Sequence, residues 1–400
     1  MTASGPSSAT QRTTDPAAVT PNLPRTPDEA SPLTAEDIMT TITDVEIRPL
    51  VIPASIDAPD AADFVGMTAV RNEIYRDISG HDDHRMEPDE LLPHYRPSAY
   101  EERLAWVIVD DGAIIGRVGL DFPHEEGSRV GFWLVELLRA HWGRGIGTRA
   151  VEMIERIARE RGRTVLQSWA EHPATDAPLP RLAPPTGFGD VPTDHIARFM
   201  LRHGYALEQV ERCSAFDLTG SFDVVERLLA QAEAASPGYR VVQWFAPTPP
   251  EFVEGYAWMK SRMSTDAPSA ELEFDEESWD AGRIAEHDEK YTGTGRTIQV
   301  TAAQHIATGE LCAFNELVIG KDRTAASHQE DTLVLKEHRG HKLGTLVKCA
   351  GLLSWRGVAP RSPRVITYNA EENRPMLDIN EAIGFAPISY DGAWKKVLDD

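Results

Sequence analysis

One local pattern occurs twice in this 400-residue chain: an apolar strand ends, a short glycine-containing loop follows, and an amphipathic helix begins. The first copy is Trp142-Gly-Arg-Gly-Ile-Gly147 and the second is Arg339-Gly-His-Lys-Leu-Gly344. Both copies are preceded by several strands and followed by a strand, a second helix and a closing pair of strands. A repeated order of elements predicts two copies of one α+β unit.

The predicted domain boundaries follow from this repeat. Residues 1–43 are rich in Ser, Thr, Pro and Ala and have no apolar period, which predicts a disordered tail. The first unit is expected over residues 44–220 and the second over 239–400, with a linker helix over 221–238. A length of 400 residues is typical of two or three domains rather than one.

A proline-rich stretch distinguishes the first copy from the second. From Gly147 to Gly204 there are 57 positions, against 40 from Gly344 to Gly384. The extra residues fall where Pro and Gly cluster, so residues 173–192 are predicted to be a loop insertion.

Composition excludes several classes of partner. The formal net charge of -23 disfavours a nucleic acid or an anionic membrane as partner. No apolar run approaches the roughly 20 residues of a membrane span, and no secretory leader is evident, so we expect a cytoplasmic protein. The 3 cysteines form no CxxC pair, so neither a metal site nor a disulfide is predicted. The sequence leaves the oligomeric state open.

The strand–loop–helix pattern itself suits an anion, because helix N-termini present free N–H groups. A dinucleotide-binding loop has a third glycine at the position of Thr148. It also follows the first strand of its domain, whereas several strands precede this loop. A Walker A loop would want a lysine before Ser or Thr, and neither copy has one. A tight turn without a ligand remains an alternative.

The two loops resemble the signature of the GNAT acetyltransferase superfamily, Arg/Gln-x-x-Gly-x-Gly/Ala. Gly145 and Gly147 match in the first copy, where Trp142 replaces Arg or Gln; Arg339 and Gly344 match in the second, where Lys342 replaces the central glycine. A later family pattern is also present, since Asn373 stands eleven residues before Gly384-Phe385. The first copy has Thr193 and Gly204-Tyr205 at these places. The tandem layout is similar to that of two-domain actinobacterial acetyltransferases such as mycothiol synthase.

The resemblance implies an α+β fold of two tandem GNAT domains, each with a mixed, mostly antiparallel sheet flanked by helices. It also implies acetyl-CoA as cofactor. The strand ends whose backbone would pair with pantetheine are Leu137, Leu138, Val334 and Leu335. The loop residues that would hold the pyrophosphate, with the later asparagine, are Gly143, Arg144, Gly145, Ile146, Gly147, Thr148, Arg339, Gly340, His341, Lys342, Leu343, Gly344 and Asn373.

Acetyl transfer to an amine needs a group that removes the amine proton, which costs roughly 4–5 kcal/mol at neutral pH for a pKa of ~10.4. The candidate bases by position are Glu136 in the first copy and Glu330 and Asp331 in the second. Many family members use a tyrosine as acid seven residues after the asparagine. Met200 and Asn380 stand there instead, and neither can act as an acid.

Two further stretches have polar side chains that could matter. His81-Asp-Asp-His84 looks like a set of metal ligands, but without a further ligand nearby it is interpreted as a solvated loop. The acidic run from Glu271 to Glu277 is interpreted as a solvated loop, or as a rim that attracts a cationic substrate.

These observations predict an acetyl-CoA-dependent N-acyltransferase that acts directly on a small amine. The alternative is a catalytically weak or inactive tandem protein that binds CoA or serves as a scaffold. The first copy is expected to bind CoA more tightly, because Lys342 puts a long side chain where the family has glycine.

Overall fold

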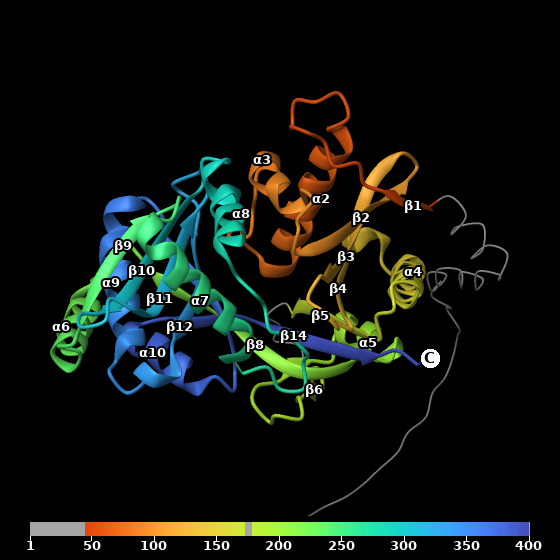
Figure 1. The fold of residues 1–400 in the computed structure, drawn as a ribbon. Coiled ribbons are helices and arrows are strands. Elements are labelled where there is room, and N and C mark those ends of the chain that lie inside the picture. Colours follow the sequence, from red (N-terminus) through yellow and green to blue (C-terminus); the bar gives the residue numbers. More distant parts are fainter. Residues whose placement is uncertain (1–44, 173–177, 267, 400) are drawn as a thin grey trace, which may run out of the picture.

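The computed structural model describes residues 45–172, 178–266 and 268–399. The predicted N-terminal tail lies outside these residues. In the first half the chain builds a sheet with helices on both faces (Figure 1). Its strands are β1 (Val45–Pro49), β2 (Glu101–Asp110), β3 (Ala113–Pro123), β4 (Val130–Leu137), β5 (Val165–His172) and β8 (Ala206–Asp217). Its helices are α2 (Ala62–Ser79), α3 (Pro88–Leu91), η1 (Leu92–Tyr95), η2 (Arg139–His141), α4 (Ile146–Glu160) and α5 (His195–Arg202).

The second half repeats this order, as the sequence predicts. Its strands are β9 (Tyr239–Phe245), β10 (Thr297–His305), β11 (Leu311–Ile319), β12 (Ser327–Val334), β13 (Arg364–Ala370) and β14 (Ala386–Val397). Its helices are α6 (Asp223–Ala235), α7 (Pro250–Asp266), α8 (Ala281–Thr292), η3 (Lys336–His338), α9 (Leu343–Val358) and α10 (Arg374–Ile383). Helix α6 lies where the linker helix was expected. The predicted α+β fold of two similar halves is confirmed.

The two halves share one continuous sheet of 12 strands in the order β1-β2-β3-β4-β5-β14-β8-β13-β12-β11-β10-β9. The last strand of each half crosses to the other: β14 pairs with β5, and β8 pairs with β13. The expectation that each half closes with a pair of strands is therefore wrong, because each half ends in one long strand. Pairing with the other half gives these strands two neighbours each and leaves no open edge at the centre of the molecule.

Helices cover both faces of the sheet. In the second half, Val318 packs in the core formed with α7 and α8, whereas its neighbours Leu317 and Ile319 pack in the core formed with α6 and α9. Because successive strand residues point to opposite faces, α7 and α8 lie on one face and α6 and α9 on the other. The first half is arranged alike: Val107 packs with α2 and Ile108 with α4.

The proline-rich stretch is mostly irregular, as predicted, but it contains a small ladder of β6 (Arg181–Leu182) and β7 (Val191–Pro192). Residues 173–177 of this stretch lie outside the described part. Among the described helices, we find none with the length and apolar composition needed to cross a membrane.

Candidate functional site

Each half contains a pair of parallel strands that separate after a short stretch of pairing. Strands β4 and β5 pair only from Val130 to Phe132 on β4, and β12 and β13 only at Ser327 and His328 on β12. Beyond these residues the two strands of each pair diverge toward the predicted cofactor loop. A gap of this kind exposes backbone N–H and C=O groups that an extended amide-containing ligand can pair with.

The two loops have the same backbone conformation although their sequences differ. Gly143 and Gly340 adopt left-handed φ values of 77° and 89°. Gly145 and Lys342, each at the N-cap of the following helix, have φ values of 77° and 55°. A non-glycine residue in this region costs roughly 1–2 kcal/mol, so the second loop is held in its shape against strain at Lys342. The Lys342 side chain is exposed.

The last glycine of each loop makes room for a helix. A Cβ at Gly147 would lie 3.1 Å from the Phe199 ring of α5, and one at Gly344 would lie 2.9 Å from Ile379 Cδ1 of α10. Ile146 and Leu343 beside them are buried core residues, so only their backbone can face a ligand. Thr148 lies 3.2 Å from His203 through its hydroxyl. Asn373 is at the N-cap of α10, next to the end of β13.

Some backbone groups at the strand ends that are predicted to pair with pantetheine already form hydrogen bonds within the protein. The Leu138 and Leu335 N–H groups donate to the carbonyls of Ile115 and Cys312. The Leu137 and Val334 carbonyls each accept one hydrogen bond from a side chain of the loop that follows. A carbonyl oxygen has two lone pairs, so these two groups retain capacity for a ligand.

Ion pairs hold the two loops differently. In the first half, Arg144 pairs with Asp110 at 2.5 Å and contacts His141. In the second half, the Asp266 carboxylate lies 3.0 Å from Lys336 and 3.7 Å from Arg339, and its side chain is only 2% exposed. Burial opposes the charge, but Lys336 and Arg262 hold the pKa of Asp266 below its usual value. His341 of this loop is exposed. A protein carboxylate thus already neutralises the cations of the second loop.

The three candidate bases lie in different surroundings. The Glu136 carboxylate forms a two-point contact with Arg117 at 2.6 and 2.8 Å. Burial works against its charge, yet Arg117 outweighs it and keeps the pKa of Glu136 below its ordinary value. Asp331 lies 2.5 Å from Lys260, which similarly overcomes burial and lowers the pKa of Asp331. Both carboxylates are paired and are poor proton acceptors.

Glu330 differs from the other two. It is reached by solvent, yet protein atoms surround it, and this desolvation raises the pKa of its carboxyl above the usual value. It stands at an irregularity in the pairing of β11 with β12, where two residues of β12 oppose one of β11. A bulge redirects side chains locally and is common beside active sites.

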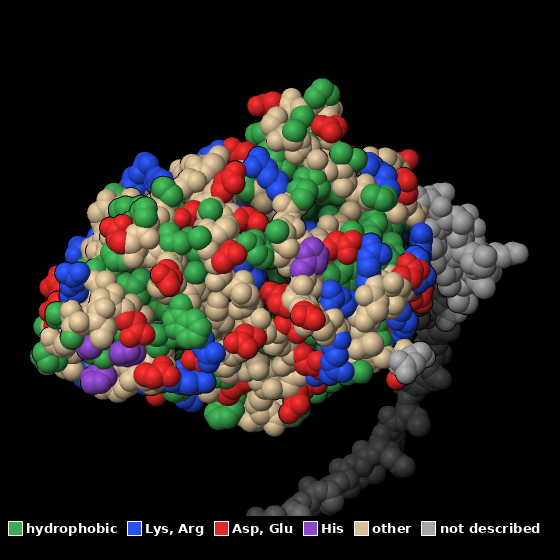
Figure 2. Space-filling view, viewed as in Figure 1, with side chains coloured by type: hydrophobic (Ala, Val, Ile, Leu, Met, Phe, Trp, Pro, Cys, Tyr) green, Lys and Arg blue, Asp and Glu red, His purple; other side chains and the backbone are tan. Residues whose placement is uncertain are grey.

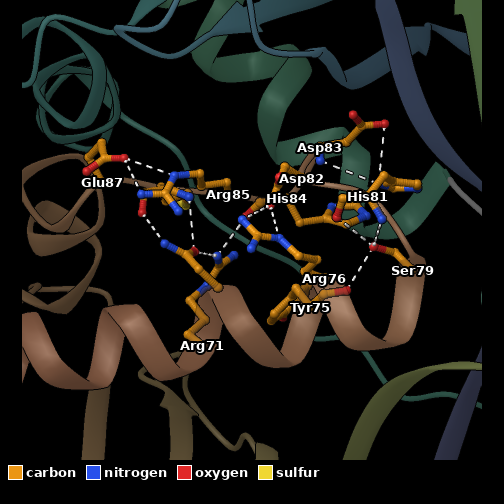
Figure 3. A network of polar contacts seen from close by, with 12 residues as sticks. Arg71, Tyr75, Arg76, Ser79, His81, Asp82, Asp83, His84, Arg85 and Glu87 are labelled. Atoms are coloured by element: carbon orange, nitrogen blue, oxygen red, sulfur yellow. Dashed lines mark hydrogen bonds and ion pairs between the residues drawn. The ribbon is translucent and has the colours of Figure 1, made fainter.

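Each half also covers the diverging strands of the other. Residues 80–87 of the first half lie against β12 and β13: the Asp83 carbonyl contacts His328 at 3.0 Å, and His84 lies 3.3 Å from the Tyr368 hydroxyl. Figure 3 shows how this segment is held to α2, where Arg71 donates to the His84 carbonyl at 2.7 Å. Asp83 and His84 are buried, so the interpretation of this stretch as a solvated loop is wrong.

The acidic run of the second half makes the reciprocal contact. Glu273 exchanges two hydrogen bonds between its backbone and the Gln167 side chain of β5, and its carboxylate pairs with Arg129 at 2.7 Å. Phe274 stacks on Phe132, with ring centroids 6.1 Å apart. This part of the run is packed on the first half, so the expectation of a solvated loop is wrong for it.

A cavity of about 170 Å³ lies where the two halves meet. Its wall includes Phe132 at the point where β4 and β5 separate, and the aromatic rings of Tyr100 and Trp279. Carboxylates from both halves line it: Glu101, Asp121, Glu125, Glu277 and Glu286. His287 also lines the cavity and influences the pKa of Glu330. Sequence reasoning missed this cavity because its residues come from segments far apart in the chain.

Comparison with known proteins agrees with the fold described above. Residues 68–178 match the sequence model of the acetyltransferase (GNAT) family. A solved tandem GNAT protein from the clavulanic acid biosynthesis pathway, in a form without AcCoA, is similar over 89% of this chain and 99% of its own, with 23% identity and a TM-score of 0.66. A GCN5-related N-acetyltransferase from Sphaerobacter thermophilus covers 88% and 96%, with 13% identity and a TM-score of 0.55. The search of curated proteins gives no match.

Proposed function

We propose that this chain, a tandem acetyltransferase of the GNAT superfamily, transfers an acetyl group from acetyl-CoA to a small amine in the cytoplasm. The observation that carries the proposal is the paired geometry of the two halves: diverging parallel strands lead into a loop with two left-handed positions and then into a helix N-terminus. Acetyl-CoA would supply the activated acyl group. The residues that would hold it are the strand ends and loop residues predicted from the sequence.

The fit of a pyrophosphate to the first loop rests on its backbone. Gly143 leaves open space before the N-terminus of α4, since a Cβ there would meet no atom within 4 Å, and Gly145 is the left-handed N-cap of this helix. In the second loop Asp266 competes with an anionic ligand for Lys336 and Arg339. We therefore expect the first half to hold CoA more firmly, because Gly145 adopts the left-handed N-cap conformation without strain, whereas Lys342 must be held in it.

The proton acceptor is assigned to Glu330 of the second half. Of the three candidates, it is the exposed residue and the one whose carboxyl pKa is raised rather than lowered. A raised pKa makes a carboxylate a better base for an ammonium group near neutral pH. The proposal is thus a division of labour, with firm CoA binding in the first half and chemistry in the second.

A cationic acceptor fits the cavity between the halves. Five carboxylates and three aromatic rings line it. Arg283, which also lines it, places its guanidinium 4.9 Å from the Tyr100 ring and 4.7 Å from that of Trp279. Aromatic faces and carboxylates together suit an ammonium group.

A second function, CoA binding without catalysis, is favoured by one observation. Met200 is buried in the first half, and the buried Asn380 donates to the Asn369 side chain at 2.7 Å. Both positions serve packing, so neither half offers a tyrosine there to protonate the departing thiolate.

A matched pair of variants tests the division of labour. Gly145→Glu and Lys342→Glu each place a carboxylate at the left-handed N-cap of a cofactor loop; Gly145→Asn is the control, because Asn tolerates this conformation without adding charge. Calorimetric titration with acetyl-CoA should lose its tighter binding event only in Gly145→Glu. Release of free CoA with a panel of small primary amines should fail in Lys342→Glu.

The base is tested separately. Glu330→Gln should lower kcat at least ~100-fold while leaving the affinity for acetyl-CoA unchanged. A wild-type protein that binds acetyl-CoA but acetylates no amine would favour the binding function. Unchanged turnover in Glu330→Gln would refute the assignment of the base.

A further inference from the structure

Ligand-type side chains converge beside the second cofactor loop. Glu310 and Cys312 stand at the start of β11, and His338 ends η3, immediately before Arg339. Within the described ranges, these three residues bring one oxygen, one sulfur and one nitrogen atom to within 4.8 Å of one another. In Figure 2 histidine side chains gather on the surface near α6, the helix that leads into β9.

Neighbouring side chains orient His338 for such a role. The Tyr239 hydroxyl of β9 contacts His338 Nδ1 at 2.8 Å. This leaves Nε2 directed toward Glu310, whose carboxylate is 3.7 Å away. A histidine that binds a metal through one ring nitrogen is commonly held by a hydrogen bond at the other, which fixes both tautomer and ring orientation.

We propose that Glu310, Cys312 and His338 bind a Zn²⁺ ion. Thiolate, imidazole and carboxylate are the three donor types that zinc takes in proteins, and three protein ligands leave a fourth, tetrahedral position for water. Ligand atoms around one zinc ion lie roughly 3.3–3.8 Å apart, given zinc–ligand distances of about 2.0–2.3 Å. The half-exposed Glu310 side chain can move to close the remaining distance.

Binding requires a proton to leave. Zinc takes cysteine as the thiolate, so the S–H bond of Cys312 must break when the metal binds. The sulfur–zinc bond replaces the S–H bond, and the proton goes to solvent. No oxidant or reductant takes part.

The first half provides an internal comparison. The Leu138 N–H donates to the Ile115 carbonyl as the Leu335 N–H does to the Cys312 carbonyl, so Ile115 corresponds to Cys312. Ala113 and His141 then correspond to Glu310 and His338. The first half has no thiol or carboxylate at these two places and instead fixes its loop through Asp110, which contacts His141 and Arg144. Zinc in the second half would have the role that Asp110 has in the first, because it would join the turn before β11 to the start of the cofactor loop.

Co²⁺ is the probe for this site, because its absorption reports the ligands. Titration of the full chain after treatment with a chelator should give one equivalent of tetrahedral Co²⁺, with visible bands and a near-ultraviolet thiolate band, and Zn²⁺ should displace it. Cys312→Ser should abolish the thiolate band. Cys349→Ser, which removes a buried thiol of α9, should retain it.

Two further variants keep the test decisive if Cys312→Ser does not fold. Glu310→Gln changes a half-exposed side chain and should weaken Co²⁺ binding about tenfold or more without loss of the fold. Tyr239→Phe should weaken it by about 10–100-fold, as for other residues that orient a ligand. The proposal is overturned if the wild type gives no tetrahedral spectrum, or if Glu310→Gln and Cys312→Ser bind Co²⁺ as the wild type does.

Discussion

The indole Nε1 of Trp142 donates a hydrogen bond to the carbonyl of Leu137 at 2.8 Å, five residues back along the chain. In the second half Arg339 Nε makes the corresponding bond to the Val334 carbonyl at 3.2 Å. The two side chains, one apolar and one cationic, thus hold the end of the diverging strand to the cofactor loop in the same way. Trp142 also stacks on His195 of α5, with ring centroids 4.3 Å apart.

This equivalence predicts how substitutions at Trp142 behave. Trp142→Arg should retain acetyl-CoA binding, because arginine can restore the bond to Leu137 and adds a positive charge near the pyrophosphate. Trp142→Ala loses the bond and the stacking, and we expect acetyl-CoA affinity to fall up to about tenfold, the equivalent of one hydrogen bond. Calorimetric titration measures both. Equal losses in the two variants would mean that the bond to Leu137 does not shape the loop.

Asp266 should limit anion binding in the second half. Asp266→Asn removes the carboxylate that pairs with Lys336 and Arg339 and leaves these cations for a phosphate. We expect the KM for acetyl-CoA to fall by roughly threefold to tenfold, since a charge interaction of this kind is worth about 1 kcal/mol. The steady-state rate of CoA release measures the change. Asp77→Asn, at the corresponding pair with Arg139 of the first half, serves as the comparison. A higher KM in Asp266→Asn would contradict the competition.

The effect of Gly344→Ala on protein stability should depend on the side chain at position 379. Gly344→Ala alone should destabilise the protein, because the new Cβ would lie 2.9 Å from Ile379 Cδ1. In an Ile379→Val background, which lacks that methyl group, the same change should stabilise by up to about 1 kcal/mol through helix propensity. Urea denaturation of the four proteins in this double-mutant cycle measures the coupling. Additive effects would show that the close approach of α9 and α10 imposes no constraint at this glycine.

The buried amine of Lys348 should make the free energy of unfolding depend on pH. It is 1% exposed in α9, and burial lowers the pKa of its amine to about 7. Because the unfolded amine has a pKa of ~10.4, the unfolded state binds more protons between about pH 7 and 10. The free energy of unfolding should therefore rise with pH across this window, by up to about 1.4 kcal/mol per unit from this group.

The comparison of two lysine variants isolates that contribution. Lys348→Met should be more stable than the wild type at pH 7, and its advantage should shrink by about 2 kcal/mol between pH 7 and pH 9. Lys342→Met, at an exposed position, should keep the wild-type pH dependence. Urea denaturation at the two pH values gives the result. Parallel pH profiles for the wild type and Lys348→Met would show that the buried amine does not titrate near neutrality.

The candidate bases show how far the sequence alone can lead. Position along the strands predicted Glu136, Glu330 and Asp331 equally well, because all three are carboxylates near the expected site. Their partners, Arg117 and Lys260, come from other elements, and these partners set the direction of each pKa. The sequence does not predict the zinc ligands that we propose, because Cys312 and His338 are 26 positions apart, with no spacing typical of a metal site.

The sequence by itself determined what depends on neighbours along the chain. Strand alternation, amphipathic helices and the glycines of two similar loops predicted the α+β repeat, because dihedral preferences and hydrophobic periods are local properties. Only the tertiary structure decided that β14 pairs with β5 and β8 with β13, and that residues 80–87 and Phe274 each cover the other half. An edge strand accepts any partner with a free row of N–H and C=O groups, so its neighbour is chosen by how the two halves pack and not by its own residues.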